Sequence, residues 1–219
     1  MAAAPNIYII GSQCTGKTTL CNAVSEYLNQ HPATLEGPPG AIKEVARTIL
    51  KNHGFTRGDI RSSQDRTLEL QRLIIEGQFE AEKTELQTHS WFISDRSGFD
   101  PIIYARKYVS KEAADGLVAS PKWREMRDRM AKSLIIVCVG EDWLRDDGVR
   151  LMPLDKTEWR QLHAEFCSAL AGFGLEYHIL PSSVGDRDER VQFVLERWEE
   201  KRTRLIIGAD EDGQTKASR

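Results

Sequence analysis

Eight residues near the start of the chain have the types and spacing of a phosphate-binding loop. Gly11, Ser12, Gln13, Cys14, Thr15, Gly16, Lys17 and Thr18 match Gly-x4-Gly-Lys-[Ser/Thr] at every fixed position. Glycines let the backbone wrap closely around phosphates, Lys17 can reach the β- and γ-phosphate oxygens, and Thr18 can offer its hydroxyl to Mg²⁺. With Thr19 next in the chain, these residues form the predicted nucleotide-binding segment.

An acidic residue ends the third apolar run of the chain. Asp95 follows Trp91-Phe-Ile-Ser94, and ligands of open α/β sheets gather at the carboxyl ends of strands. A carboxylate there could hold Mg²⁺ directly or through water, or it could be a turn residue or a helix cap. Arg96 and Asp100 flank the same place, and Asp100 could also cap a helix before Pro101.

A second acid–base pair follows an earlier predicted strand, at residues 41–44. Glu44 could accept the proton of a substrate hydroxyl, and Arg47, one helical turn on, could bind an acceptor anion. The same two residues could instead form a solvated helix pair. The sequence leaves open whether Glu44 or the strand-end Asp95 would be the catalytic base.

Two arginines stand in a charged turn shortly after the fourth apolar run. The segment 145–150 reads Arg-Asp-Asp-Gly-Val-Arg, and both Arg145 and Arg150 could neutralise a transferring phosphoryl group from a mobile lid. A plain charged surface turn would have the same composition.

The elements that must position these residues alternate between strands and helices. Apolar runs predict strands at residues 6–10, 41–44, 91–94, 134–139 and 177–180. Periodic patterns predict helices at residues 18–29, 62–86, 101–108, 111–130, 155–171 and 186–202, with capping at Ser62 and at Asp155. A further helix is expected to follow the second strand and to end at Leu50. The unbroken run 134–139 is typical of a strand buried on both faces of a parallel sheet. We expect an α/β three-layer sandwich in one domain, residues 1–207, and a disordered polar tail, residues 208–219.

The composition argues against several other classes of protein. The 219 residues include 30 basic and 33 acidic side chains, so the formal charge of -3 gives no general attraction to nucleic acid. No apolar run approaches the roughly 20 residues of a membrane span, and we expect a cytoplasmic protein without a transmembrane segment. Four scattered cysteines lack metal spacing and suit a reducing compartment. Cys14 is either a small loop residue or a thiol acidified by the helix N-terminus.

Taken together, these motifs resemble those of a known family. The loop from Gly11, the Glu44-x-x-Arg47 step, Asp95-Arg96-Ser97 with Asp100-Pro101-x-x-Tyr104, and Asp147-Gly148-x-Arg150 resemble the P-loop kinase module of ribosylnicotinamide kinases and of related "AAA-like" proteins. This resemblance implies an adenylate-kinase-like sheet of five parallel strands in the order 2-3-1-4-5, ATP as donor, Lys17 and Thr18 as phosphate and Mg²⁺ contacts, Asp95 as the strand-end acid and Arg150 as a lid arginine.

Two functions remain in competition at this point. The first is Mg²⁺-dependent phosphoryl transfer from ATP to a small hydroxyl-bearing metabolite, with a nucleoside-like acceptor as one option. The second is a regulatory ATP- or GTP-binding protein, although no Asn-Lys-x-Asp guanine motif is present. Phosphorylation of nucleic-acid ends and an AAA+ motor are disfavoured, because a basic tract and clear sensor motifs are missing. None of these patterns sets the oligomeric state.

Overall fold

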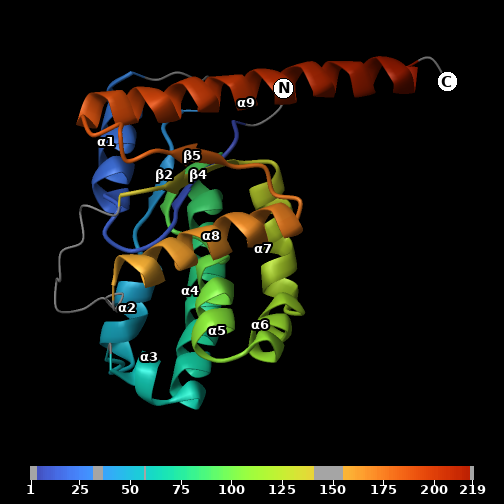
Figure 1. The fold of residues 1–219 in the computed structure, drawn as a ribbon. Helices are drawn as coiled ribbons and strands as arrows, with labels where there is room; N and C mark the ends of the chain where they lie inside the picture. Colours follow the sequence, from blue (N-terminus) through green and yellow to red (C-terminus); the bar gives the residue numbers. More distant parts are fainter. Residues whose placement is uncertain (1–3, 32–36, 57, 141–154, 218–219) are drawn as a thin grey trace.

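Five parallel strands form the centre of the computed structural model, which describes residues 4–31, 37–56, 58–140 and 155–217 (Figure 1). The strands are β1 (Ile7–Ile10), β2 (Gly40–Ile42), β3 (Phe92–Asp95), β4 (Leu134–Cys138) and β5 (His178–Leu180). Their order across the sheet is β2-β3-β1-β4-β5, and every pair is parallel. The predicted fold class and strand order are therefore confirmed.

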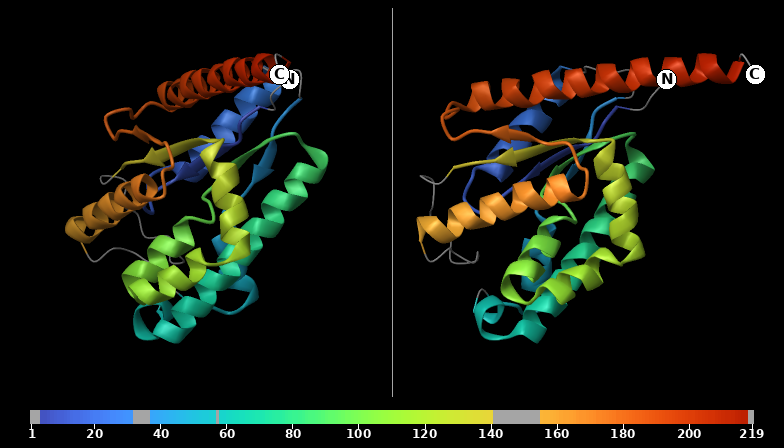
Figure 2. Two further views of the ribbon diagram at one scale, coloured as in Figure 1. Left: turned by 90° about the vertical axis from the view of Figure 1, so that its right-hand side faces the viewer. Right: turned by 45° about the vertical axis from the view of Figure 1, so that its right-hand side comes forward.

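Helices cover both faces of this sheet (Figures 1 and 2). α1 (Lys17–Gln30) and α9 (Arg187–Ala217) pack against each other on one face. The helices on the other side are α2 (Val45–Asn52), α3 (Asp59–Ser62), α4 (Gln64–Thr88), α5 (Asp100–Tyr108), α6 (Lys111–Val118), α7 (Pro121–Ala131) and α8 (Lys156–Gly172). The result is the expected three-layer sandwich.

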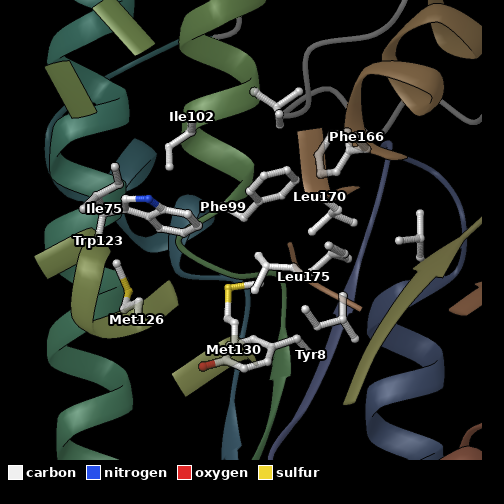
Figure 3. Close-up of a cluster of buried hydrophobic side chains, with 14 of the residues drawn as sticks. Tyr8, Ile75, Phe99, Ile102, Trp123, Met126, Met130, Phe166, Leu170 and Leu175 are labelled. Carbon is white, nitrogen blue, oxygen red and sulfur yellow. The ribbon is translucent and has the colours of Figure 1, made fainter. Parts of the chain in front are cut away.

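Alternate residues of the central strands supply two separate cores. Tyr8 and Ile10 of β1 face a cluster built with α4 to α8, which Figure 3 shows around Phe99 and Trp123. Ile7 and Ile9 face the other cluster, which α1 and α9 complete. Because both faces are buried, the strands need apolar residues at consecutive positions, which explains their unbroken apolar runs.

Several element boundaries differ from expectation; for example, the strand expected at residues 41–44 is Gly40–Ile42. Ser63, not Ser62, caps α4, since its side chain accepts from the backbone N–H of Arg66. The helix expected over 111–130 is two helices, because Pro121 cannot continue a helix and instead begins α7. The α9 backbone is helical to Ala217, and the division into a domain over residues 1–207 and a tail from residue 208 stays a prediction. Each added residue of an existing helix gains one hydrogen bond without a new nucleus.

A membrane-spanning helix is not found in the described parts of the chain, since none of their helices is both long enough and apolar enough to cross a bilayer.

Candidate functional site

The phosphate loop connects the end of β1 to the first turn of α1. Three of its residues have positive φ angles: Gly11 at 121°, Cys14 at 59° and Gly16 at 73°. Gly16 is the N-cap of α1 and has no side chain that could accept a hydrogen bond from the first turn. The first-turn N–H groups, including that of the exposed Thr19, are therefore available to an anion.

Gly11 has a structural reason to be glycine. A Cβ atom at this position would lie 2.8 Å from the carbonyl oxygen of Cys138 on β4, with a φ angle that side chains rarely adopt. We expect Gly11→Ala to lower the melting temperature by at least about 3 °C, because roughly 1–2 kcal/mol of backbone strain adds to the clash. It should also weaken nucleotide binding.

Gly116→Ala provides the matched control for this change. Gly116 lies in α6, and nothing lies within 4 Å of a Cβ atom built there. Alanine is the better helix former, so this variant should melt at the wild-type temperature or higher. Equal melting temperatures for Gly11→Ala and wild type would contradict the close approach of the loop to β4.

Lys17 is buried and folded back onto its own loop. Its Nζ atom donates to the carbonyl oxygen of Ser12 and, over 3.2 Å, to Oγ1 of Thr15. Burial, and then the charge of Arg96, lowers the pKa of Lys17 to about 8. A bound phosphate would supply the negative charge that this ammonium group lacks in the loop.

Asp95 lies beside the phosphate loop, as the sequence predicts. Its Oδ2 atom accepts a hydrogen bond of 2.5 Å from the Thr18 hydroxyl, and the side chain is buried. Its Oδ1 atom is also buried and has no hydrogen-bond partner among the described residues. A hydroxyl and a carboxylate with one oxygen that has no hydrogen-bond partner fit Mg²⁺, which takes few protein ligands and completes its shell with water and phosphate oxygens.

Glu44 and Arg96 are joined in a buried charge network. Glu44 accepts from Arg96 at 2.8 Å and from Arg47 at 2.7 Å, and its side chain is only 8% exposed. Arg96 also donates to Asp100 at 3.0 Å and to the carbonyl oxygen of Gly11 at 3.4 Å. The Glu44–Arg47 pair therefore exists, but the Glu44 end is buried rather than solvated.

Arg96 is held in an unusual backbone conformation. Its φ angle is 82°, a region that costs a non-glycine residue about 1–3 kcal/mol. Its backbone N–H donates to the carbonyl oxygen of Ile9, so the strain lies where β3 leaves the sheet beside β1. Burial raises the pKa of Asp100, which the neighbouring Arg96 counteracts. The chain thus fixes Arg96 where it can orient both Glu44 and Asp100.

A pocket opens between the phosphate loop and helices α2 to α5. Its polar lining includes Gln13 of the loop, Glu44, Arg96, Asp100 and Gln78 of α4. The remaining wall is mainly apolar, with Val45, Leu50, Ile60, Leu70, Ile74 and Pro101. Its empty volume, which includes open solvent at the mouth, is about 670 Å³.

Sequence reasoning missed Trp159 and Arg190, which position the loop, and named Tyr104 only as part of a motif. Trp159 of α8 donates its indole N–H to the Gln13 carbonyl oxygen at 3.2 Å, and Arg190 of α9 donates to that of Thr15 at 3.0 Å. The Tyr104 hydroxyl donates to the Gln13 side chain at 3.0 Å. Trp159 and Arg190 lie more than 140 positions from the loop, and no local pattern marks such contacts.

The remaining predicted residues have different outcomes. Cys14 is buried within the loop, which limits access to its thiol. Arg145 and Arg150 lie outside the described residues, so their predicted lid role stays a prediction.

The described residues contain no group of three or more His, Cys, Asp or Glu side chains that could hold a metal ion by themselves. The Thr18–Asp95 pair would need phosphate oxygens and water to complete a Mg²⁺ shell.

Solved structures share this architecture. The NadR protein in complex with NR aligns with a TM-score of 0.66 at 24% identity, over 89% of this chain and 51% of that one. Deoxyadenosine kinase from M. mycoides aligns with a TM-score of 0.59 at 13% identity, over 89% and 99% of the two chains. Thymidylate kinase from Ehrlichia chaffeensis gives 0.57 at 15% identity, over 89% and 98%. This chain thus matches about half of the NadR chain, and these likenesses establish the fold.

The sheet order, the phosphate loop and these neighbours define a P-loop protein with the fold of nucleoside and nucleotide kinases. A family model described as "AAA domain" matches residues 6–190. The chain therefore belongs to this AAA-domain family, and the resemblance to ribosylnicotinamide kinases agrees with its fold. The search of curated proteins found no match.

Proposed function

We propose that this protein transfers a phosphoryl group from ATP to the hydroxyl group of a small, nucleoside-like molecule, and that the reaction requires Mg²⁺. The observation that carries this proposal is the pocket beside the phosphate loop, which Gln13 of the loop and the charged Glu44 and Arg96 line together. An acceptor in this pocket would lie next to phosphates held by the loop. Positioning and electrostatics supply most of the rate enhancement in phosphoryl transfer.

Two groups of residues would divide the work at the nucleotide. The loop amides and Lys17 would bind the phosphates, while Thr18 and Asp95 would hold Mg²⁺. When bound, the ion neutralises charge that develops on the phosphate oxygens. Arg145 and Arg150 are proposed to add positive charge from the segment that follows β4.

Glu44 is our candidate for the base that accepts the hydroxyl proton. Glu44 lines the acceptor pocket, whereas Asp95 does not and is bonded to Thr18. Arg47 and Arg96 hold the Glu44 carboxylate in place, so a substrate hydroxyl would meet a fixed acceptor. We assign proton acceptance to a Glu44 carboxylate oxygen and the metal to Asp95.

The alternative is a regulatory protein that binds ATP or GTP and transfers little or no phosphate. One observation favours it: both Glu44 oxygens already accept hydrogen bonds from arginines, which competes with a role as base. In that case the network would transmit nucleotide binding rather than assist chemistry.

The substitution Glu44→Gln distinguishes these functions. We expect it to lower kcat by about 100-fold or more, as for loss of a general base, with ATP affinity changed only a few-fold. Turnover would be measured with whichever nucleoside the wild-type protein phosphorylates, and ATP affinity by calorimetry.

Glu69→Gln is the matched control. Glu69 forms an ion pair with Arg66 at the same i, i+3 spacing, but both side chains are exposed, at 57% and 41%. This variant should behave as wild type, because exposed pairs contribute little. Near-normal kcat in Glu44→Gln would remove Glu44 from the chemistry and favour the regulatory function.

A further inference from the structure

Gln78 of α4 belongs to a buried polar chain that ends at the acceptor pocket. Its Nε2 atom donates to Oε1 of Glu82 at 3.0 Å and to Oγ of Ser94 at 3.1 Å. Gln78 is 1% exposed, and Glu82 and Ser94 are fully buried. An amide nitrogen carries two protons, so both are used within the protein.

The carboxylate of Glu82 sets which way this amide points. Its Oε2 atom accepts from the Tyr8 hydroxyl at 3.0 Å and forms a salt bridge with Arg129. Burial raises the pKa of Glu82, while its hydrogen bonds from Gln78 and Arg129 oppose that shift. The pairing with Arg129 favours the ionised form, since a neutral Glu82 would leave that guanidinium without its buried partner. An ionised carboxylate only accepts hydrogen bonds, so the nitrogen of Gln78 must face it.

The oxygen of Gln78 is therefore left for an occupant of the pocket. Gln78 lines the pocket, and no donor among the described residues reaches its Oε1 atom. A ligand N–H or O–H would satisfy this oxygen, whereas a ligand carbonyl, carboxylate or phosphate would place one acceptor against another. Leaving a polar atom unpaired on binding costs affinity.

We propose that Gln78 is a specificity-determining residue that requires a hydrogen-bond donor on the acceptor molecule, and that Glu82 is the positioning residue that enforces it. This inference rests on the proposed function, because it assumes that the pocket receives the phosphoryl acceptor. Under the proposed function, the acceptor class that we infer from this requirement is a nucleoside whose base carries an exocyclic amino group. The surrounding apolar lining, including Leu50, Ile60 and Ile74, suits the faces of such a ring.

Two pairs of probes test the proposal by binding, without ATP. Adenosine and purine riboside differ by one amino group, as do cytidine and pyrimidin-2-one riboside. We expect wild-type protein to bind the amino-bearing member of at least one pair about tenfold more tightly or better, as measured by calorimetry. Gln78→Met should bring the two members of that pair within about threefold of each other.

Ser94→Ala is the matched control, since it removes the other partner of Gln78 and leaves Glu82 to orient the amide. We expect Ser94→Ala to keep the preference. If Gln78→Met does not fold, Glu82→Gln tests the same point, because an amide at position 82 accepts or donates and should lower the preference. A folded Gln78→Met variant with unchanged preference, or no binding of either pair, would overturn the proposal.

The outcomes also separate this inference from the proposed function. Binding with a Gln78-dependent preference, but without phosphorylation when ATP is added, would support the role of Gln78 and contradict the kinase. Phosphorylation with a preference that Gln78→Met leaves unchanged would support the kinase and contradict the role of Gln78.

Discussion

Lys17→Ala is expected to reduce phosphoryl transfer by at least about 100-fold, the loss typical when one preorganised electrostatic contact is removed. Lys17 lies inside the loop within reach of Ser12 and Thr15, and no described carboxylate forms a salt bridge with it. A bound phosphate would therefore supply its counter-charge. Triphosphate affinity should fall as well, while the chain should remain folded. Titration calorimetry with ATP and a steady-state transfer assay would measure the two effects.

Lys83→Ala is the control for removal of a lysine side chain. Lys83 lies on α4 and is exposed, so this variant should bind and react as wild type. Circular dichroism melts of both variants separate loss of contact from loss of fold. ATP binding and transfer by Lys17→Ala at wild-type levels would rule out the phosphate-loop assignment.

Asp95→Asn is expected to remove Mg²⁺-dependent activity by about 100-fold or more, because a neutral amide is a much poorer ligand for Mg²⁺ than a carboxylate. Asparagine has nearly the same shape and can still hydrogen-bond to the Thr18 hydroxyl, so the fold should be kept. Nucleotide affinity measured without metal should change only a few-fold. Transfer rates across a Mg²⁺ titration, together with ATP binding in the presence of a chelator, would report both quantities.

Asp128→Asn is a suitable control for this variant. Asp128 is exposed on α7 and pairs only with Arg127 among the described residues, so its neutralisation should not alter the response to Mg²⁺. If Asp95→Asn lost metal-free nucleotide binding to the same extent as activity, Asp95 would act through the loop rather than through the metal.

The parts of this fold that sequence could predict are those written in local patterns. The phosphate loop is contiguous, and its glycines carry the backbone angles that the turn needs. The strands follow from apolar runs because both faces of the sheet are buried. Asp95 could be found because it directly follows such a run. The order of the strands came from the family resemblance, since crossover connections leave no local mark.

The rest of the site depends on contacts between distant segments. Arg96 bonds to Glu44, 52 positions away, and this contact turns an ordinary helix pair into a buried network. Gln78 had one overlooked signal: Gln71, Ile74, Gln78 and Glu82 are spaced along the buried face of α4, where glutamine and glutamate are unusual. A polar residue at an apolar position of a helix indicates either a buried network or a ligand; Gln78 forms such a network, and we propose that it also contacts a ligand.

The most direct test of the proposed function is a transfer assay with labelled ATP. Purified protein, Mg²⁺ and ATP labelled at the γ-phosphate would be incubated with a panel of nucleosides and other small hydroxyl compounds, and the products would be identified by mass spectrometry. We predict that at least one acceptor gains the label, and that Lys17→Ala and omission of Mg²⁺ each prevent it. Tight ATP binding without label transfer to any compound of the panel, or of a metabolite extract, would contradict the kinase and favour a regulatory nucleotide-binding protein.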